Sequence, residues 1–506
     1  MRVPSRVKLS SAIGVALFFS SPSEARDYRV SPVDPQAEYS SLSAMGSLKL
    51  FPGDRVLLDG GHVYPGSIHI GPQQSGDSRS YVMISSYGSG RATIEASPDS
   101  DGILIQNAHH VEISSLRVKA SNRNGIHIQS STPSLPTANI IIRDVEVFGA
   151  QGVDRISVNQ GVFEQNGTGI LVNNQLGGGA VRNVWIDRVH SHHHLNSGVR
   201  VGNCLNERHS GIEISRARVH DNWGVPNYRE RHSGSGIEMG GVSRSRIVLS
   251  VAYDNGRDNI ANGGPIGIWA WNADQVTISD NVSFRNRTSS RSDGGGFDLD
   301  GSVSDSIMEG NIAFENDGAG FLLCDFPWSE PVSNVVVRNN LSFRDGRKNR
   351  YGGLSVSGRV HGAILEGNSI FLNSTRAGSA QPSGFFGYEA EALRSIVLRD
   401  NSFFAASSDR LVDIDSLQGV QMEGNQVLAC GSEPEARVGT DLRKLTDLTP
   451  GFSPVAELSD RFCSRLPHFL RMLEPVGPEA SELREFLRGL SCGAGLMASS
   501  QVCGRF

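Results

Sequence analysis

Three aspartates, Asp293, Asp298 and Asp300, stand close together in the segment SDGGGFDLDGS. Asp298 and Asp300 alternate with the apolar residues Phe297 and Leu299, which is the pattern of a strand with one buried face. Side chains two residues apart on such a strand point the same way and lie roughly 6–7 Å apart. Carboxylates this close raise one another's pKa, so that one can act as an acid while the other acts as a base. The spacing is near the border between the separations of about 5.5 Å and 6.5 Å that distinguish retaining from inverting glycosidases.

Other groups share the predicted outward face because the chain repeats a unit that opens with Gly–apolar–x–apolar. One outward column holds Arg200, Glu238, Trp269 and Asp298, and the adjacent column holds Trp271, Asp300 and Cys324. Acids for proton transfer beside aromatic rings for stacking are what a sugar-binding groove requires. The alternative is that outward charges are simply solvated, but two exposed tryptophans favour a site.

These patterns give a set of candidate residues. The expected acid/base groups are Asp298, Asp300, Asp293 and Asp317, with Glu238 in reserve. The expected substrate contacts are Trp269, Trp271, Arg200, His232, Arg291 and Arg347. Arg291 and Arg347 belong to two basic clusters that flank the acids and suit carboxylated sugars, although a solvated turn explains them equally well.

A metal is not required by this reading, and no metal ligand is assigned. Calcium is the rival occupant of the aspartate cluster, because grouped carboxylates and turn carbonyls are hard-cation ligands. Half of the 14 histidines fall between residues 190 and 232, but their spacing matches no known metal site. These histidines are His190, His192, His193, His194, His209, His220 and His232.

The element that must position the site is a strand repeat, clearest in Gly267–Gly353. Its anchor glycines begin strands at Gly125, Gly169, Gly198, Gly236, Gly267, Gly296, Gly320 and Gly353. The units are too short to include a helix, so the repeat predicts a right-handed parallel β-helix over residues 26–430. Two ladders of asparagines, and one of aromatic residues expected to fill the interior, are interpreted as structural. The segment Asn222–Ser235 is turn-rich and is expected to wall a groove.

The flanking segments differ from the repeat. Residues 1–25 have the charged start, short apolar run and small-x-small ending of a secretory signal, and the run is too short to span a membrane. Residues 431–506 carry helical spacing, as in Pro478–Leu490, and are expected to cap the open end of the coil. Four cysteines in the last part of the chain are consistent with export; the favoured pairs are Cys430–Cys463 and Cys492–Cys503.

Two motifs resemble known families. The pattern "PGD-x-V…G-x-Y-x-G…SYG" near the start resembles the first coils of secreted β-helix proteins that act on polysaccharides. SDGGGFDLD followed by ENDGAGF resembles polygalacturonase-type glycosidases, which implies that Asp293 and Asp317 are catalytic; Asn316 stands where that family has a further Asp. The same stretch resembles the calcium-binding coil of β-helix pectate lyases, with Leu322 near the position of their lysine base.

The sequence therefore predicts a secreted or periplasmic enzyme that cleaves a polysaccharide, most simply a glycoside hydrolase. A polysaccharide lyase or C5-epimerase acting on an acidic glycan, and a non-catalytic β-helix that binds exopolysaccharide, are the alternatives. The formal net charge of −6 argues against a nucleic-acid partner. We expect no membrane span and a monomer.

Overall fold

The computed structural model describes residues 25–45, 48–157, 162–202, 207–372, 382–406, 410–430, 435–438, 458 and 460–490. Nearly all of the predicted signal lies outside these residues. So do Cys204, Cys492, Cys503 and the side chain of Cys430. The predicted signal and disulfide pairs therefore stay predictions.

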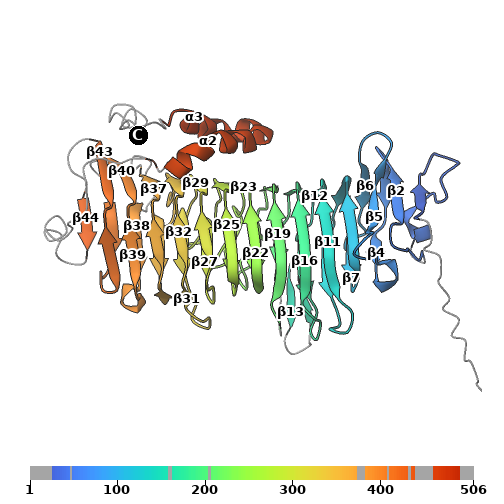
Figure 1. Cartoon of the computed structure of the whole chain (residues 1–506), viewed down its shortest axis with the longest axis horizontal. Helices are drawn as coiled ribbons and strands as arrows, with labels where there is room; N and C mark the ends of the chain where they lie inside the picture. The colour runs from blue at the N-terminus through green and yellow to red at the C-terminus, as the bar shows by residue number, and fades with distance from the viewer. Residues whose placement is uncertain are drawn as a thin grey trace, which may run out of the picture.

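The chain forms a parallel β-helix, as the repeat predicts. Three long parallel sheets, here called A, B and C, run along the molecule with 14, 13 and 13 strands, and each coil contributes one strand to each sheet in turn. Figure 1 shows the strands advancing along the long axis from the N-terminal to the C-terminal end. All eight anchor glycines that the sequence singled out lie at or next to strands of sheet C.

Within each sheet, the strands lie side by side in the order in which they occur along the chain. Sheet C consists of β4 (Ile68–Ile70), β7 (Ile103–Gln106), β10 (Ile126–Ser130), β15 (Ile170–Asn174), β18 (Val199–Val201), β21 (Ile237–Gly240), β24 (Ile266–Trp271), β27 (Gly295–Asp300), β30 (Phe321–Cys324), β34 (Gly352–Ser357), β38 (Ser383–Tyr388), β41 (Arg410–Ile414) and β44 (Glu435–Val438). Sheet B consists of β3 (Val63–Pro65), β6 (Ala92–Glu95), β9 (Leu116–Lys119), β12 (Glu146–Phe148), β17 (His190–His192), β20 (Arg218–His220), β23 (Val251–Tyr253), β26 (Val282–Phe284), β29 (Ile312–Phe314), β33 (Leu341–Phe343), β37 (Ser369–Phe371), β40 (Ser402–Ala406) and β43 (Gln426–Cys430). Sheet A consists of β1 (Asp27–Val30), β2 (Arg55–Asp59), β5 (Val82–Tyr87), β8 (His109–Ser114), β11 (Thr137–Arg143), β16 (Val181–Asp187), β19 (His209–Ser215), β22 (Val242–Val248), β25 (Asp274–Ser279), β28 (Ile307–Glu309), β32 (Val336–Arg338), β36 (Ile364–Glu366), β39 (Ile396–Arg399) and β42 (Val420–Glu423).

Shorter strands and helical segments lie outside the three long sheets. Two two-stranded ribbons pair β13 (Arg155–Ser157) with β14 (Val162–Glu164) and β31 (Val332–Ser333) with β35 (Val360–His361). The helical segments are η1 (Leu42–Met45), η2 (Pro72–Gln74), η4 (Ala390–Ala392), α2 (Asp460–Met472), η5 (Glu474–Ala480) and α3 (Ser481–Arg488). Among the described helices, none has the length and apolar content needed to cross a membrane.

The interior of the coil is a continuous apolar core built from alternate strand residues. At the turns, asparagines stack from coil to coil, and the side-chain amide of Asn281 donates to Asn311, which in turn donates to Asn340, at 3.0 and 3.1 Å. Each of these buried amides also donates to a backbone carbonyl, for example Asn311 to Ile278 at 2.9 Å. The asparagine ladder thus satisfies buried polar groups, and its predicted structural role is confirmed.

The aromatic ladder lies on the other side of sheet B from where the sequence placed it. Phe284, Phe314 and Phe343 point out of the coil, while small residues such as Ser283 and Ala313 point in. The outer rings are buried because α2, η5 and α3 pack over them, with the Phe343 and Phe486 ring centroids 3.8 Å apart.

The described helices accordingly lie along the flank of the coil, and the expected position across its open end is wrong for them (Figure 1). Burying this outward stripe of aromatic rings removes apolar surface from water, which stabilises the helices in this position.

Candidate active site

A cavity of about 470 Å³ opens on the outer face of sheet C. Its floor comes from β24, β27 and β30, and its walls come from segments that connect these strands and from β34 and β38. The lining residues are Gly263, Gly264, Ile266, Trp269, Arg291, Ser292, Asp293, Asp298, Asp300, Leu322, Cys324, Asp325, Phe326, Arg350, Tyr351, Ser357, Phe386 and Tyr388. Aromatic walls with a few convergent carboxyl groups are typical of a ligand site.

Asp298 and Asp300 lie on the floor because β27 alternates. Phe297 and Leu299 are completely buried in the coil, so their neighbours point outward, as the sequence predicts. Parallel register places Trp269 and Leu322 on either side of Asp298. Asp298 nevertheless has little contact with solvent: it is only 2% exposed, because the cavity walls enclose it, whereas Asp300 is half-buried.

Cys324 joins the two carboxyl groups. Its thiol donates to Asp300 Oδ1 at 3.2 Å and lies 3.8 Å from both oxygens of Asp298. One oxygen of each aspartate and the sulfur all lie within 4.8 Å of one another. The Cys324 thiol is a poor ligand for calcium, which takes six to eight hard oxygen ligands, so no chemical step is derived from this ion. Calcium binding by the aspartate cluster stays a prediction of the sequence.

Enclosure favours the protonated form of each acid. Burial, followed by the charge of Asp300, raises the pKa of Asp298 well above its usual range. Burial also raises the pKa of Asp300 to about 7, although the Gly301 N–H, which donates to it at 2.7 Å, opposes the shift. Burial, and then the charge of Asp298, raises the pKa of the Cys324 thiol, which therefore remains a donor at neutral pH. At neutral pH the pair has one proton donor, Asp298, and one group that is close to ionisation, Asp300.

Asp293 belongs to the same cavity but to the turn before β27. Its φ of 56° is left-handed, a conformation that Asp tolerates. Its Oδ1 accepts from the hydroxyl of Tyr351 at 3.3 Å, and its backbone N–H donates to the same hydroxyl at 3.3 Å. Burial raises the pKa of Asp293 to about 6. The structure thus brings together three of the four aspartates that the sequence selected.

The fourth aspartate has a different surrounding. Asp317 does not line the cavity; it accepts from the Thr288 backbone N–H at 3.1 Å and pairs with Arg287 at 3.3 Å. Arg347 also lies away from the cavity and pairs with Glu315 at 2.8 Å, whereas Arg291 lines the cavity and is exposed.

Glu238 and Arg200 form a buried network on the neighbouring coils. Arg200 is 4% exposed and lies 3.2 Å from Glu238 and 3.1 Å from Asp154. Glu238 also accepts from the Trp271 Nε1–H at 3.1 Å. Neither charged residue lines the cavity. Trp271 is half-buried beside this network, so it is not the exposed sugar platform that the sequence suggested.

His232 and Trp269 form the boundary between that network and the cavity. The His232 ring meets the Trp269 ring edge-on, with the ring centroids 5.3 Å apart. The segment Asn222–Ser235 therefore packs behind Trp269, and none of its residues lines the cavity. Trp269 is 4% exposed, which corrects the expectation of an exposed indole. Its Nε1–H is buried and has no hydrogen-bond partner among the described residues, although the side chain lines the cavity. A buried donor without a partner is costly, and a ligand oxygen in the cavity would satisfy it.

Replacing Trp269 by phenylalanine tests whether this N–H serves the ligand. We expect the variant to unfold at the same or a slightly higher temperature, because an unsatisfied donor is removed. We expect the dissociation constant of a ligand that accepts from this N–H to rise about tenfold, the effect of one hydrogen bond of about 1.4 kcal/mol. Thermal unfolding and titration calorimetry with the class of ligand that the sequence predicts, a glycan, measure the two effects separately; an unchanged dissociation constant would exclude a contact between this N–H and the ligand.

Several lining residues were missed or undervalued in the sequence. Tyr351 had no signal, because its proximity to Asp293 depends on the stacking of coils 58 positions apart in sequence. Arg350 stood in a basic cluster without an assigned role, and it pairs with Asp413 at 2.8 Å. Phe386 and Tyr388 lie on β38, where Gly384 repeats the anchor pattern once more in GFFGY and would have extended the outward columns by one coil.

Comparisons with known proteins establish the architecture. No protein-family model matches the chain, and no curated protein matches it significantly. Solved structures do match. A GH136 lacto-N-biosidase from Eubacterium ramulus superposes with a TM-score of 0.53 and 16% identity, covering 82% of this chain and 68% of that one. A mannuronic acid specific polysaccharide family 6 lyase from human gut microbiota superposes with a TM-score of 0.57 and 14% identity, covering 92% and 98%.

The chain has the β-helix fold of these proteins. At such low identity the likeness extends to the fold alone, and the chemistry has to be argued from the cavity of this chain.

Proposed function

We propose that this protein is an exported glycoside hydrolase whose acid/base pair is Asp298 and Asp300. The observation that carries the proposal is the pair itself: two carboxyl groups whose oxygens lie within 4.8 Å of one another, on the floor of an aromatic-walled cavity. Asp298, kept protonated by burial and by Asp300, would donate a proton to the glycosidic oxygen. Asp300, the first of the two to ionise, would attack the anomeric carbon as the protonated alcohol leaves. Asp298, now a carboxylate, would then take a proton from the water that cleaves the bond between the sugar and Asp300. The closeness of the two carboxyl groups favours the retaining mechanism, in which they lie about 5–5.5 Å apart, so we expect the stereochemistry to be retained.

A lyase or C5-epimerase on the same fold needs a base that removes the C5 proton of a uronate. Among the described residues that line the cavity there is no lysine. Its basic residues are Arg291 and Arg350, of which Arg350 pairs with Asp413, and arginine makes a poor base, so the remaining candidate base is Tyr351. Burial, and then the charge of Asp293, raises the pKa of Tyr351 above its usual range, which opposes that role. Asp293, Asp298 and Asp300 would also repel a uronate carboxylate once ionised. Hydrolysis of a neutral glycan fits the cavity better.

The deciding experiment incubates the mature chain with a panel of glycans and measures three products. We expect new reducing ends, no unsaturated product absorbing in the ultraviolet, and, by proton NMR of the first turnovers, retention of the anomeric configuration. An unsaturated product would establish a lyase instead. Binding without any time-dependent product would indicate a carbohydrate-binding β-helix, and an inverted anomer would exclude Asp300 as the nucleophile.

The pH dependence of kcat/KM should follow the two carboxyl groups. Activity requires Asp300 ionised and Asp298 protonated, so it should rise as the pH increases through about 7, the pKa of Asp300. It should fall again at higher pH, as Asp298 with its more strongly raised pKa loses its proton. Initial rates from pH 3 to 10 under subsaturating substrate test this order. A maximum near pH 4–5 would show that carboxyl groups with ordinary pKa values do the work.

A further inference from the structure

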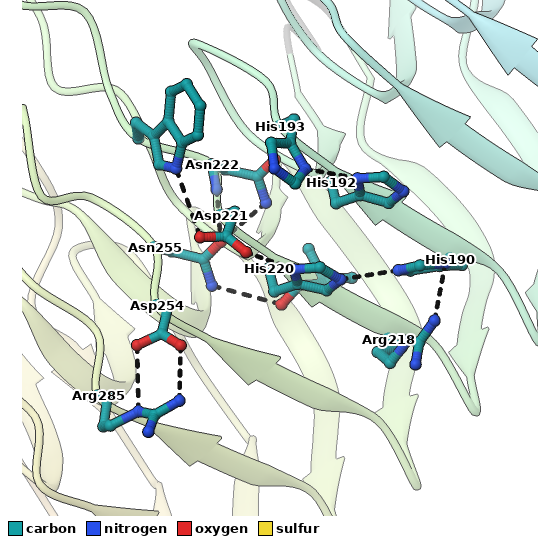
Figure 2. Close-up of polar contacts among 12 residues, drawn as sticks. His190, His192, His193, Arg218, His220, Asp221, Asn222, Asp254, Asn255 and Arg285 are labelled. Atoms are coloured by element: carbon teal, nitrogen blue, oxygen red, sulfur yellow. Dashed lines mark hydrogen bonds and ion pairs between the residues drawn. The ribbon is translucent and has the colours of Figure 1, made fainter. Parts of the chain in front are cut away.

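A second cluster of functional groups lies on sheet B, on a different face of the coil from the cavity. His190 and His192 point outward from β17, and His220 points outward from the next strand, β20, directly opposite His192 in register. All three are half-buried. Figure 2 shows their rings gathered with His193 and Asp221 on or next to strands from the middle of the sheet. Nothing in the proposed hydrolysis uses these residues.

Hydrogen bonds determine which ring nitrogen carries the proton in His190 and in His220. Arg218 donates to His190 Nδ1 at 2.8 Å, so the Nε2 of a neutral His190 carries its proton. That Nε2–H can donate to His220 Nε2, 2.7 Å away. His220 then carries its proton on Nδ1, which donates to Asp221 Oδ2 at 2.8 Å (Figure 2). His220 is therefore held by a carboxylate at Nδ1 and presents the lone pair of Nε2 to the centre of the cluster.

His220 therefore has the surroundings of a metal-ligating histidine, in which a carboxylate accepts from one ring nitrogen and the other is available to the metal. Ligating histidines usually donate their second ring N–H to a carboxylate, which fixes the ring and increases its basicity. His192 has a similar neighbour, because its Nε2 lies 3.4 Å from Glu146 Oε1. One ring nitrogen from each of His190, His192 and His220 lies within 4.8 Å of the other two. Nitrogens that bind one zinc ion at 2.0–2.1 Å lie about 3.3 Å apart, so modest ring rotations bring them to bonding distance.

Stacking alone does not account for imidazoles at these positions. The column that holds His192 and His220 continues with Phe148 on one side and Tyr253 on the other, and adjacent rings stack nearly parallel at 4.6–5.7 Å. Phenylalanine or tyrosine meets the packing need in the neighbouring coils. Because the stacked rings direct their nitrogens along parallel planes, His192 must turn about its Cβ–Cγ bond to share a ligand with His220.

We propose that His190, His192 and His220 bind one divalent late transition metal ion, of which Zn²⁺ is the representative. Neutral imidazoles suit zinc, copper and nickel and are poor ligands for calcium and magnesium. Three histidine ligands leave a fourth position for water or for His193, whose Nδ1 lies 2.6 Å from His192 Nδ1. Asp221 offsets part of the charge of the ion, while Glu146, which also pairs with Arg117 at 2.8 Å, supports the His192 ring.

Metal binding would replace the hydrogen bond between His190 and Arg218. Arg218 already donates its other nitrogen to the Pro475 carbonyl in η5, so the guanidinium keeps an acceptor when His190 turns to the metal. His190 then moves its proton from Nε2 to Nδ1. The site would join two successive coils just beyond the part of sheet B that the C-terminal helices cover (Figure 1).

The proposal is tested by calorimetric titration of the untagged mature chain with Zn²⁺, after treatment with a chelator. We expect one ion per chain with a dissociation constant below about 1 µM, and a rise in unfolding temperature on saturation. His220→Phe, which continues the aromatic column, should weaken binding at least about 100-fold. Asp221→Asn tolerates the left-handed φ of 52° at this position and should weaken binding about 10- to 100-fold. Co²⁺ should give the absorption bands of a tetrahedral or five-coordinate site.

Two further measurements keep the test decisive. His192→Phe, which also continues the column, should lose the same binding, so that a folding defect in one variant does not decide the result. His110→Gln alters a separate pair, in which the His109 and His110 Nδ1 atoms lie 3.0 Å apart, and should leave Zn²⁺ affinity unchanged. No heat of binding by the wild type, or an affinity equal to that of the wild type in both phenylalanine variants, would overturn the proposal. Glycan hydrolysis should be unaffected in all of these variants, so the outcome is independent of the proposed function.

Discussion

Asp298→Asn and Asp300→Asn should each lower kcat on a responsive glycan by about 1,000-fold or more while the chain stays folded. Each change removes one half of the acid/base pair, and a positioned acid or base alone contributes about 10²–10⁴-fold. Asparagine matches aspartate in size, and in Asp300→Asn its oxygen can still accept the Gly301 N–H that now lies 2.7 Å from Asp300. Because the two residues act as a unit, the double variant should be little worse than either single one. Steady-state kinetics with circular dichroism as the folding control measures this.

The matched control is Asp317→Asn, which alters an aspartate one coil away that does not line the cavity. Its amide oxygen can still accept the Thr288 N–H, so we expect kcat within about threefold of the wild type. A loss of activity in Asp317→Asn as large as in Asp298→Asn would move the catalytic centre from the floor of the cavity to the turn after β29. Full turnover by both Asp298→Asn and Asp300→Asn would refute the acid/base assignment.

Arg200→Ala should destabilise the protein by about 3–5 kcal/mol, the cost of leaving buried charges without their partner. Asp154 and Glu238 lie 3.1 and 3.2 Å from the guanidinium, and all three side chains are less than a tenth exposed. Arg231 would remain 3.7 Å from Asp154, but Glu238 would keep only its hydrogen bonds from Trp271 and Ser197, and water entering the vacated space could not supply the missing positive charge. The midpoint of urea unfolding, compared with the wild type at pH 7, gives the effect.

Arg246→Ala is the corresponding surface control. Arg246 pairs with Glu213 at 2.7 Å, but its side chain is 57% exposed, so its removal should cost no more than about 1 kcal/mol. If Arg200→Ala instead unfolds like the wild type and loses only substrate affinity, the substrate-binding role that the sequence suggested for Arg200 would be correct. Equal destabilisation by the two variants would show that the Arg200 network is not sealed from water.

The sequence predicted the side of the strand on which the acids lie. In β27 the alternation of Phe297 and Leu299 with Asp298 and Asp300 leaves one consistent arrangement, because a strand has a period of two and the coil has an apolar interior. The same reasoning found the asparagine ladder, since a buried amide repeated at one point of each coil can be satisfied only by its neighbours. Both conclusions depend on contacts within one coil or between adjacent ones.

In sheet B the local sequence pattern did not determine which side of each strand faces the interior. Val282–Ser283–Phe284 has apolar residues at both ends and a small one between, and either side of that strand could face the interior. The rings point outward because α2 and α3, more than a hundred residues later, bury them. Likewise Trp269 has an outward position by alternation, yet His232 and the rest of the cavity wall cover it.

The sequence by itself therefore determined the β-helix, the face that holds Asp298 and Asp300, and the residues that link the coils. Only the tertiary structure decided which outward residues meet solvent, which form a cavity and which are sealed into ion pairs such as Arg200–Glu238. The physical reason is that alternation depends on the backbone geometry of a few neighbouring residues. Coverage depends instead on the free energy of packing between distant segments, such as Tyr351 against Asp293, and no local pattern in the sequence records that packing.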